Sequence, residues 1–174
     1  VLSYLVGTDG IVFHRQFAER GLASSMIRAA PVTCENSLLG IGADATGEMY
    51  TATGFANSMA SPSTASFRDR YRACFGDAAP ILNRFGLSCY EGVHLLASLA
   101  RRAGSLNLFK LQIAADGLSL SGPRGECRLS GNHLGSEVHI ARANGNEFEL
   151  LDHMGYMEPP GPPRAIWPPE AGRA

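Results

Sequence analysis

The alternation of apolar and helix-like segments in the first third of the chain limits its possible folds more than any other feature. Three short apolar runs, residues 1–6, 26–32 and 48–55, are separated by two segments with helical spacing, residues 8–20 and 36–45. Strands and helices that alternate at this spacing are typical of parallel βαβ units. We therefore expect the α/β class, with a parallel sheet in the N-terminal part.

Local signals predict where helices begin and end. Thr8 or Asp9 is expected to cap the first helix, and Gly21 to follow its end. In the middle of the chain, Ser61 and Pro62 predict the cap and the first residue of another helix. The middle of the chain is therefore expected to be helical.

Two further helices are expected over about residues 81–103 and 107–115. In the helix after Pro62 and in the one after Pro80, apolar residues recur every three or four positions, and such stripes normally face a core. The stripes are Phe67, Tyr71, Cys74 and Phe75 in the first helix, and Leu82, Phe85, Cys89, Val93, Leu96 and Ala100 in the second. We therefore expect Cys74 and Cys89 to be buried.

The last third reads as strands. Residues 118–120 and 126–129 flank a glycine-proline turn, and residues 137–143 and 147–151 flank Asn144-Gly145-Asn146, a strong hairpin signal. From Glu158 onward the chain is rich in proline, which predicts a tail without regular structure.

The cysteines do not form the pattern of a disulfide framework. The four residues, Cys34, Cys74, Cys89 and Cys127, lie far apart, and none forms a Cys-x2-Cys pair. Disulfide scaffolds are normally shorter chains that are denser in cysteine. We expect free thiols.

Composition argues against two classes of partner. There are 15 basic and 16 acidic residues, so the formal net charge is −1 and no polybasic arm is present for nucleic acid. No apolar run reaches the roughly 18 residues that a membrane span needs. We expect neither direct nucleic-acid binding nor a membrane span.

No catalytic or metal-binding pattern emerges. Gly86-Leu87-Ser88 begins like a nucleophile elbow but lacks the second glycine and lies in a helical stripe. Cys127, His133 and His139 follow at six-residue steps, which is not a metal-ligand spacing, and His14 and His94 stand alone. Glycine fingerprints for phosphate are also missing. We expect no enzyme activity, no metal and no cofactor.

The constructive signal lies after two of the expected strands. Gly7 and Thr8 follow the first expected strand, residues 1–6. Phe55 ends the third expected strand, residues 48–55, and Asn57 and Ser58 follow it. In open parallel sheets, ligands bind beyond the carboxyl ends of the strands. These residues therefore predict a site for a small polar ligand, although capping and turn formation would explain them equally well.

Several segments together resemble type 1 periplasmic binding proteins. They are residues 1–9 (VLSYLVGTD), 46–55 (TGEMYTATGF), Ser61-Pro62, Tyr71-Arg72, Phe75-Gly76, 88–92 (SCYEG), 122–125 (GPRG) and 131–133 (GNH). The resemblance covers about residues 1–153. It is greatest to the amide- and urea-binding group, which includes the sensor of the aliphatic amidase operon and regulators of nitrile hydratase.

The resemblance implies a partial type 1 periplasmic binding protein fold, with a parallel-sheet lobe, helices and a C-terminal β-hairpin. Residues 1–57 would be part of lobe two, 58–116 a helical segment that crosses to lobe one, 117–157 the C-terminal strands, and 158–174 a disordered tail. The first lobe-one segment of the family has no counterpart here. We therefore expect that residues, among which a signal peptide could lie, precede Val1.

The resemblance also implies a ligand. Gly7 and Thr8 match a loop whose threonine faces the ligand, Phe55 matches an aromatic position, and Asn57 and Ser58 match polar residues just beyond. The acidic residue that holds the amino group in branched-chain amino-acid binders has no clear counterpart. A small neutral amide or urea in a cleft between the lobes is therefore expected.

Two roles fit this resemblance. The protein would be a cytoplasmic amide sensor that acts on an antitermination regulator, or an extracytoplasmic receptor that delivers ligand to an ABC permease. The alternative ligand is a branched-chain amino acid. In each case the missing N-terminal lobe would be the first partner.

Overall fold

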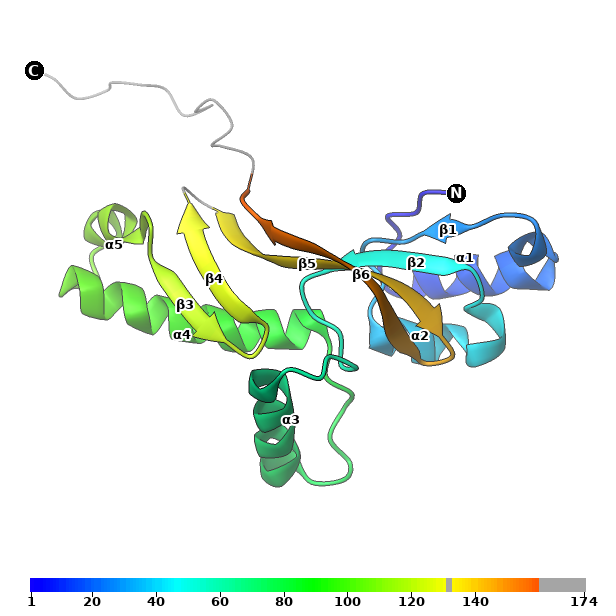
Figure 1. The fold of residues 1–174 in the computed structure, drawn as a ribbon, viewed down its shortest axis with the longest axis horizontal. Coiled ribbons are helices and arrows are strands. Elements are labelled where there is room, and N and C mark those ends of the chain that lie inside the picture. The colour runs from blue at the N-terminus through cyan, green and yellow to red at the C-terminus, as the bar shows by residue number, and fades with distance from the viewer. Residues whose placement is uncertain (131–132, 160–174) are drawn as a thin grey trace, which may run out of the picture.

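The computed structural model describes residues 1–130 and 133–159, and it shows helices packed on one mixed sheet (Figure 1). The helices are α1 (Thr8–Glu19), α2 (Glu35–Ile41), α3 (Pro62–Phe75), α4 (Arg84–Ala103) and α5 (Leu108–Ala115), with short 3-10 turns at Leu22–Ser24 and Ala43–Ala45. The strands are β1 (Arg28–Ala29), β2 (Met49–Thr53), β3 (Ser119–Gly122), β4 (Gly125–Ser130), β5 (His133–Asn144) and β6 (Glu147–Met157). This confirms the expected α/β class.

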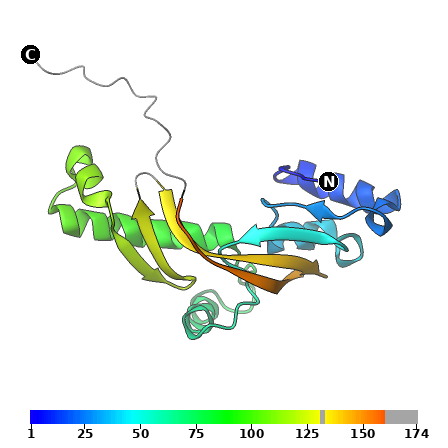
Figure 2. The same ribbon diagram turned by 45° about the horizontal axis from the view of Figure 1, so that its top comes forward.

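The sheet has the strand order β1-β2-β5-β4-β3, and β6 pairs with β5. At one end β5 pairs with β4, and further along it pairs with β2. It therefore joins a first half, which contains α1, α2, β1 and β2, to a helical half, which contains α3, α4, α5, β3 and β4 (Figures 1 and 2). The predicted hairpin around Gly145 is confirmed and is longer than expected.

The parallel arrangement of the first half is confirmed. β1 and β2 are parallel, and Leu2 forms a parallel bridge with Ala29 of β1. The expectation of a full strand over residues 1–6 was wrong, because this bridge is the only ladder contact of that run within the described residues. Extended backbone becomes a stable strand only when neighbours satisfy its hydrogen bonds, and Tyr4 and Val6 remain exposed.

The start of α1 differs from the expected cap. Thr8 is its first helical residue and Gly7, at φ +67°, is the N-cap, with no side chain bonded to the first amides. Gly10 is required by close packing, because a Cβ there would lie 2.8 Å from the carbonyl oxygen of Leu5. Gly21 follows the helix in the left-handed conformation, as predicted.

The other helix boundaries follow local capping chemistry. The Ser61 hydroxyl accepts a hydrogen bond from the Thr64 amide at 3.2 Å, and α3 begins at Pro62. Asn83 caps α4, which ends at Gly104 in the left-handed conformation. The predicted start at Ser61 and Pro62 is confirmed, because it depends on residues adjacent in sequence. The helix expected from about residue 81 begins later, at Arg84, after the cap that Asn83 provides.

The expected burial of the two helical stripes was largely wrong. On α4 the buried residues are Leu87 and Glu91, whereas Phe85, Val93 and Leu96 are 49%, 69% and 55% exposed. All four cysteines are free, as predicted, but Cys74 and Cys89 are exposed. Both stripes have helical spacing, but Phe67 and Leu82 are their only buried members, and within the described residues no element covers Phe85, Val93 or Leu96. The apolar face of α4 is therefore unpartnered in this structure.

The core lies mainly between α2 and the sheet. Leu38 and Met49 are fully buried there with Phe55, Phe148 and Ile41. The expected tail over residues 158–174 falls almost wholly outside the described residues, which end at Pro159.

Candidate functional site

The predicted site lies at one edge of the sheet, where the parallel segments of the first half have their carboxyl ends. Ala29 of β1 bonds to the run before α1 on one side, and the Ala30 amide bonds to the carbonyl of Tyr50 in β2 on the other. β1 therefore lies between the segments that lead to Thr8 and Phe55. These two residues follow strands about 10 Å apart rather than neighbouring strands.

The loop after β1, residues 30–34, was missed by the sequence reasoning. It follows the strand between the other two, so it occupies the centre of this edge. The order of the elements in the sequence already indicated the position of this loop, because consecutive parallel βαβ units place each strand beside the previous one. The edge is therefore formed by three loops, after the first run, β1 and β2.

Thr8 lies exposed at the start of α1. No side chain caps this helix, and its first backbone hydrogen bond runs from the Ile11 amide to the carbonyl of Gly7 at 3.2 Å. The amides that precede Ile11 have no partner within the helix. A hydroxyl and uncapped amides at one point can bind a carbonyl oxygen without any charged side chain.

Phe55 is 1% exposed and packs in the hydrophobic core. Its backbone is held by Thr53, whose hydroxyl donates to the Phe55 carbonyl at 2.6 Å and accepts from the Phe55 amide at 3.2 Å. In this structure the ring supports the edge from beneath. Its contact with a ligand stays a prediction.

Asn57 and Ser58 join the two halves. The Asn57 amide donates to Oε1 of Glu35 at 2.7 Å, and the Asn57 carbonyl accepts from Arg68 of α3. The Ser58 hydroxyl donates to the carbonyl of Phe148 in β6. The structure therefore does not bring these residues beside Thr8, and their hydrogen bonds hold the segment between β2 and α3.

Glu35 and Arg84 are charged residues that contact the loops of this edge. Burial raises the pKa of Glu35, and the Asn57 amide and the cation of Arg84 oppose that rise. Arg84 donates to the carbonyl of Ala52 at 3.1 Å and to the carbonyl of Pro31. Both charges are thus engaged with protein groups. The loops 30–34 and 54–58 carry no charged side chain.

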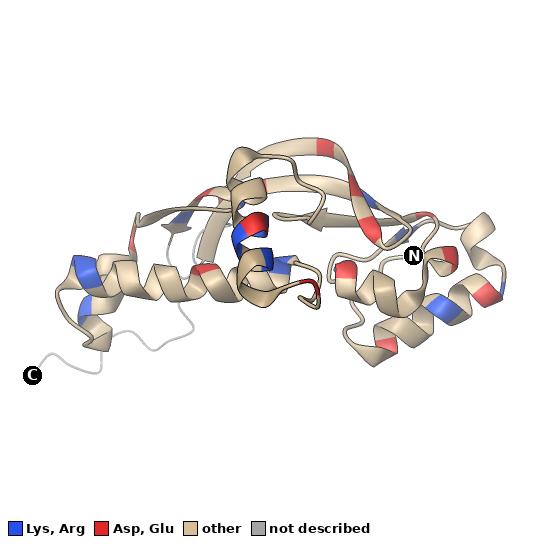
Figure 3. Ribbon diagram, turned by 90° about the horizontal axis from the view of Figure 1, so that it is seen from below, with Lys and Arg blue, Asp and Glu red and all other residues tan. Residues whose placement is uncertain are grey.

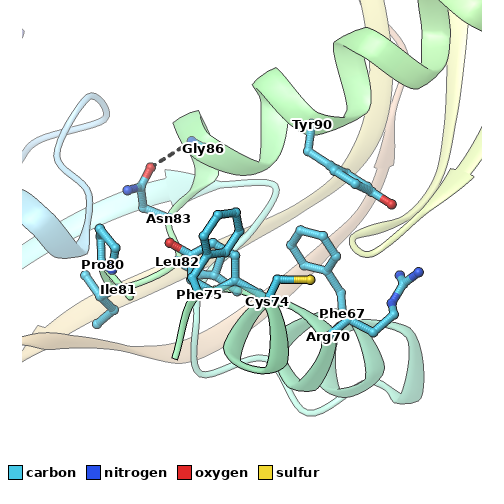
Figure 4. Close-up of a pocket in the computed structure, with 11 residues that line it drawn as sticks. Phe67, Arg70, Cys74, Phe75, Pro80, Ile81, Leu82, Asn83, Gly86 and Tyr90 are labelled. Atoms are coloured by element: carbon cyan, nitrogen blue, oxygen red, sulfur yellow. Dashed lines mark hydrogen bonds between the residues drawn. The ribbon is translucent and has the colours of Figure 1, made fainter. Parts of the chain in front are cut away.

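An apolar groove lies elsewhere in the described part of the chain. The groove, of about 600 Å³, runs between α3 and α4, and its walls are mainly apolar (Figure 4). Phe67 and Phe75 of α3 line it together with Leu82 and with Tyr90 of α4. None of the five site residues expected from the sequence lines this groove. It belongs to the helical half and is separate from the strand-end edge.

The His, Cys, Asp and Glu side chains do not gather into a metal site in the described residues. Among residues 1–130 and 133–159, no group of three His, Cys, Asp or Glu side chains could hold a metal ion. Cys127 is buried, and burial raises the pKa of its thiol to about 11, so it stays protonated near neutrality.

The described part of the chain offers no long apolar helix. None of its helices is long and apolar enough to cross a membrane. Acidic and basic residues are intermixed along the ribbon in both halves (Figure 3).

The sequence matches one protein family. A family model described as "Periplasmic binding protein" matches residues 1–147. No match was found among curated proteins.

Solved structures of solute-binding proteins share the fold. A solute-binding protein of an ABC transporter from Rhodopseudomonas palustris HaA2, in complex with p-hydroxybenzoic acid, is similar at TM-score 0.74 and 19% identity; the match covers 90% of this chain and 44% of that one. A periplasmic binding protein from Burkholderia mallei has TM-score 0.75 and 12% identity, with 87% and 42% covered. A leucine-binding protein from Thermotoga maritima has TM-score 0.69 and 14% identity, with 88% and 43% covered. The chain thus spans less than half the length of these proteins, and similarity at this identity shows the fold alone.

Proposed function

Because the chain belongs to the periplasmic binding protein family, we propose that it is part of a non-catalytic solute-binding protein that holds a small neutral amide or urea at the edge formed by Thr8 and the loops after β1 and β2. The single observation that carries the ligand class is the absence of charged side chains in loops 30–34 and 54–58. A neutral ligand needs hydrogen-bonding groups but no counter-ion, and Thr8 with the uncapped amides of α1 provides them.

A carboxylate ligand at this edge would be repelled by Asp9 in the first turn of α1 and would be stabilised only by a cation free to pair with it. Arg84 is the guanidinium that contacts the loop after β1, and both of its terminal nitrogens donate to carbonyls. Its Nε is buried without a partner within the described residues. An aromatic acid of the kind bound by the R. palustris protein therefore fits this edge less well than an amide does.

One observation favours the alternative ligand, a branched-chain amino acid. Asp9 lies exposed in the first turn of α1, next to Thr8. A carboxylate there could pair with the ammonium group of an amino acid. Leucine is therefore the competitor that a binding experiment must include.

We propose that a first lobe, preceding Val1 in the chain, covers the apolar face of the helical half and closes over the ligand. The exposed large apolar side chains of α4, α5 and the turn between them include Phe85, Val93, Leu96, Leu106, Leu108, Phe109 and Ile113. Monomeric proteins rarely leave so large an apolar surface in water. The closed form would then be recognised by an ABC permease or by an antitermination regulator.

Thr8→Val in the two-lobed protein is expected to weaken acetamide binding by about 1–3 kcal/mol, the cost of leaving a buried hydrogen-bonding group of the ligand unpaired. Titration calorimetry measures this directly. Thr8→Ser keeps the hydroxyl and is the matched control, which should bind almost as tightly as the unmodified protein. If Thr8→Val binds acetamide as well as Thr8→Ser, Thr8 is not part of the site.

A further inference from the structure

The first turn of α2 is bonded to two separate segments, the connection from β2 to α3 and the residue that caps α4. Glu35 accepts the Asn57 amide of the segment 54–61 at 2.7 Å. Its neighbour Asn36 accepts the side-chain amide of Asn83 at 2.7 Å, through Oδ1. Asn83 is the residue that caps α4, since its own Oδ1 accepts from the Phe85 and Gly86 amides. Two consecutive residues of α2 are thus hydrogen-bonded to the segment that precedes α3 and to the residue that caps α4.

The same turn continues directly from the loop after β1. Thr33 and Cys34 are 4% and 7% exposed, and Cys34 is the N-cap of α2. The Pro31 carbonyl accepts from Arg84, the first residue of α4. Because the loop is packed and bonded at both ends, a displacement of the loop must be passed to α2 and to α4.

We propose that the first turn of α2 is a shared anchor, which makes the segment 54–61 and the start of α4 move together with the loop after β1. The proposal rests on the proposed function in one respect, namely that a ligand at the strand ends displaces this loop. Glu35 and Asn36 are then positioning residues, which set the relation of the two halves without touching the ligand.

The chain offers variants that separate the two bonds. Asn36 is exposed, so Asn36→Ala removes the bond to Asn83 without opening a cavity and leaves the cap of α4 intact. Asn36→Asp retains an acceptor for the Asn83 amide and is its matched control. Glu35→Gln retains the acceptor for the Asn57 amide without the buried charge.

Hydrogen exchange of the 174-residue chain, read by mass spectrometry, tests the anchor without any ligand. Asn36→Ala is expected to speed exchange about 2- to 10-fold at the start of α4, the equivalent of one lost hydrogen bond, and to speed exchange in residues 54–61 as well. Asn36→Asp should restore both segments, and Glu35→Gln should leave both near the unmodified rates. Faster exchange at the start of α4 alone would overturn the shared anchor.

Acetamide is the second arm of the same experiment. It is expected to slow exchange in both segments of the unmodified chain and to lose its effect on the start of α4 in Asn36→Ala. Slowing of one segment only in the unmodified chain contradicts the anchor. If acetamide changes neither segment, the proposed ligand class fails, while the ligand-free comparison still decides the anchor.

Discussion

Arg124→Met is expected to destabilise the chain by about 3–5 kcal/mol, because it leaves the carboxylate of Glu91 buried without its cation. Nε of Arg124 lies 2.7 Å from Oε2 of Glu91, and Glu91 is 3% exposed. Arg124 also donates to the Ser88 hydroxyl at 2.8 Å. Burial raises the pKa of Glu91 and Arg124 opposes that rise, so the cation stabilises a charge that burial disfavours. Urea unfolding near neutral pH measures the loss.

An exposed ion pair provides the control. Arg142 and Glu149 are 2.9 Å apart but 40% and 46% exposed, so Arg142→Met should cost less than about 1 kcal/mol. The double variant Arg124→Met, Glu91→Leu should recover part of the loss, because it removes the stranded charge. Equal effects of Arg124→Met and Arg142→Met would contradict this account of the buried pair.

The chain is expected to lose about 3 kcal/mol of stability as pH falls from about 6.5 to about 4, because of His14. This imidazole is 1% exposed, and neither ring nitrogen has a hydrogen-bond partner within the described residues. Burial first, and then the cation of Arg28, lower its pKa from 6.5 to about 4. Between those values the unfolded chain binds the extra proton, so stability rises with pH across the window and is lost as pH falls. Urea midpoints measured across the window test this.

His14→Phe removes the titration and should flatten most of the pH dependence. Burial and His153 also lower the pKa of His139, so a small dependence of the same sign should remain. His139→Gln is the matched control, and it should keep the steep loss that His14 causes. An unchanged slope in His14→Phe would show that another group controls the acid lability.

The fold was predictable where it depends on neighbours in the chain. Ser61 and Gly104 mark helix ends through hydrogen bonds and backbone angles within a few residues, and Asn144-Gly145 fixes a turn in the same way. The stripe through Cys89 and Val93 was correctly read as one face of a helix. Its burial was not predictable, because burial requires a partner that no local pattern specifies.

The candidate site was predictable in its position but not in its composition. Thr8 lies at the carboxyl end of the first run, as parallel βαβ order requires. The loop after β1 was missed, although the same order places it between Thr8 and Phe55. Whether the Phe55 ring faces solvent or the core depends on side-chain packing around Met49 and Phe148, which strand periodicity alone does not determine.

Ligand-induced amide shifts of the 174-residue chain, measured by NMR, test the central claim most directly. Acetamide is expected to bind with a Kd of about 1 mM or weaker, since the proposed first lobe would have to supply the other wall of the site and roughly half of the contacts. The account predicts the largest shifts at residues 7–10, 30–34 and 54–55, with smaller shifts passed on to residues 56–61 and the start of α4. The shifts should be smaller in Thr8→Val, and leucine and p-hydroxybenzoate should produce no response at these loops. Shifts at these loops with leucine or p-hydroxybenzoate but not with acetamide, or tight acetamide binding by this chain alone, would contradict it.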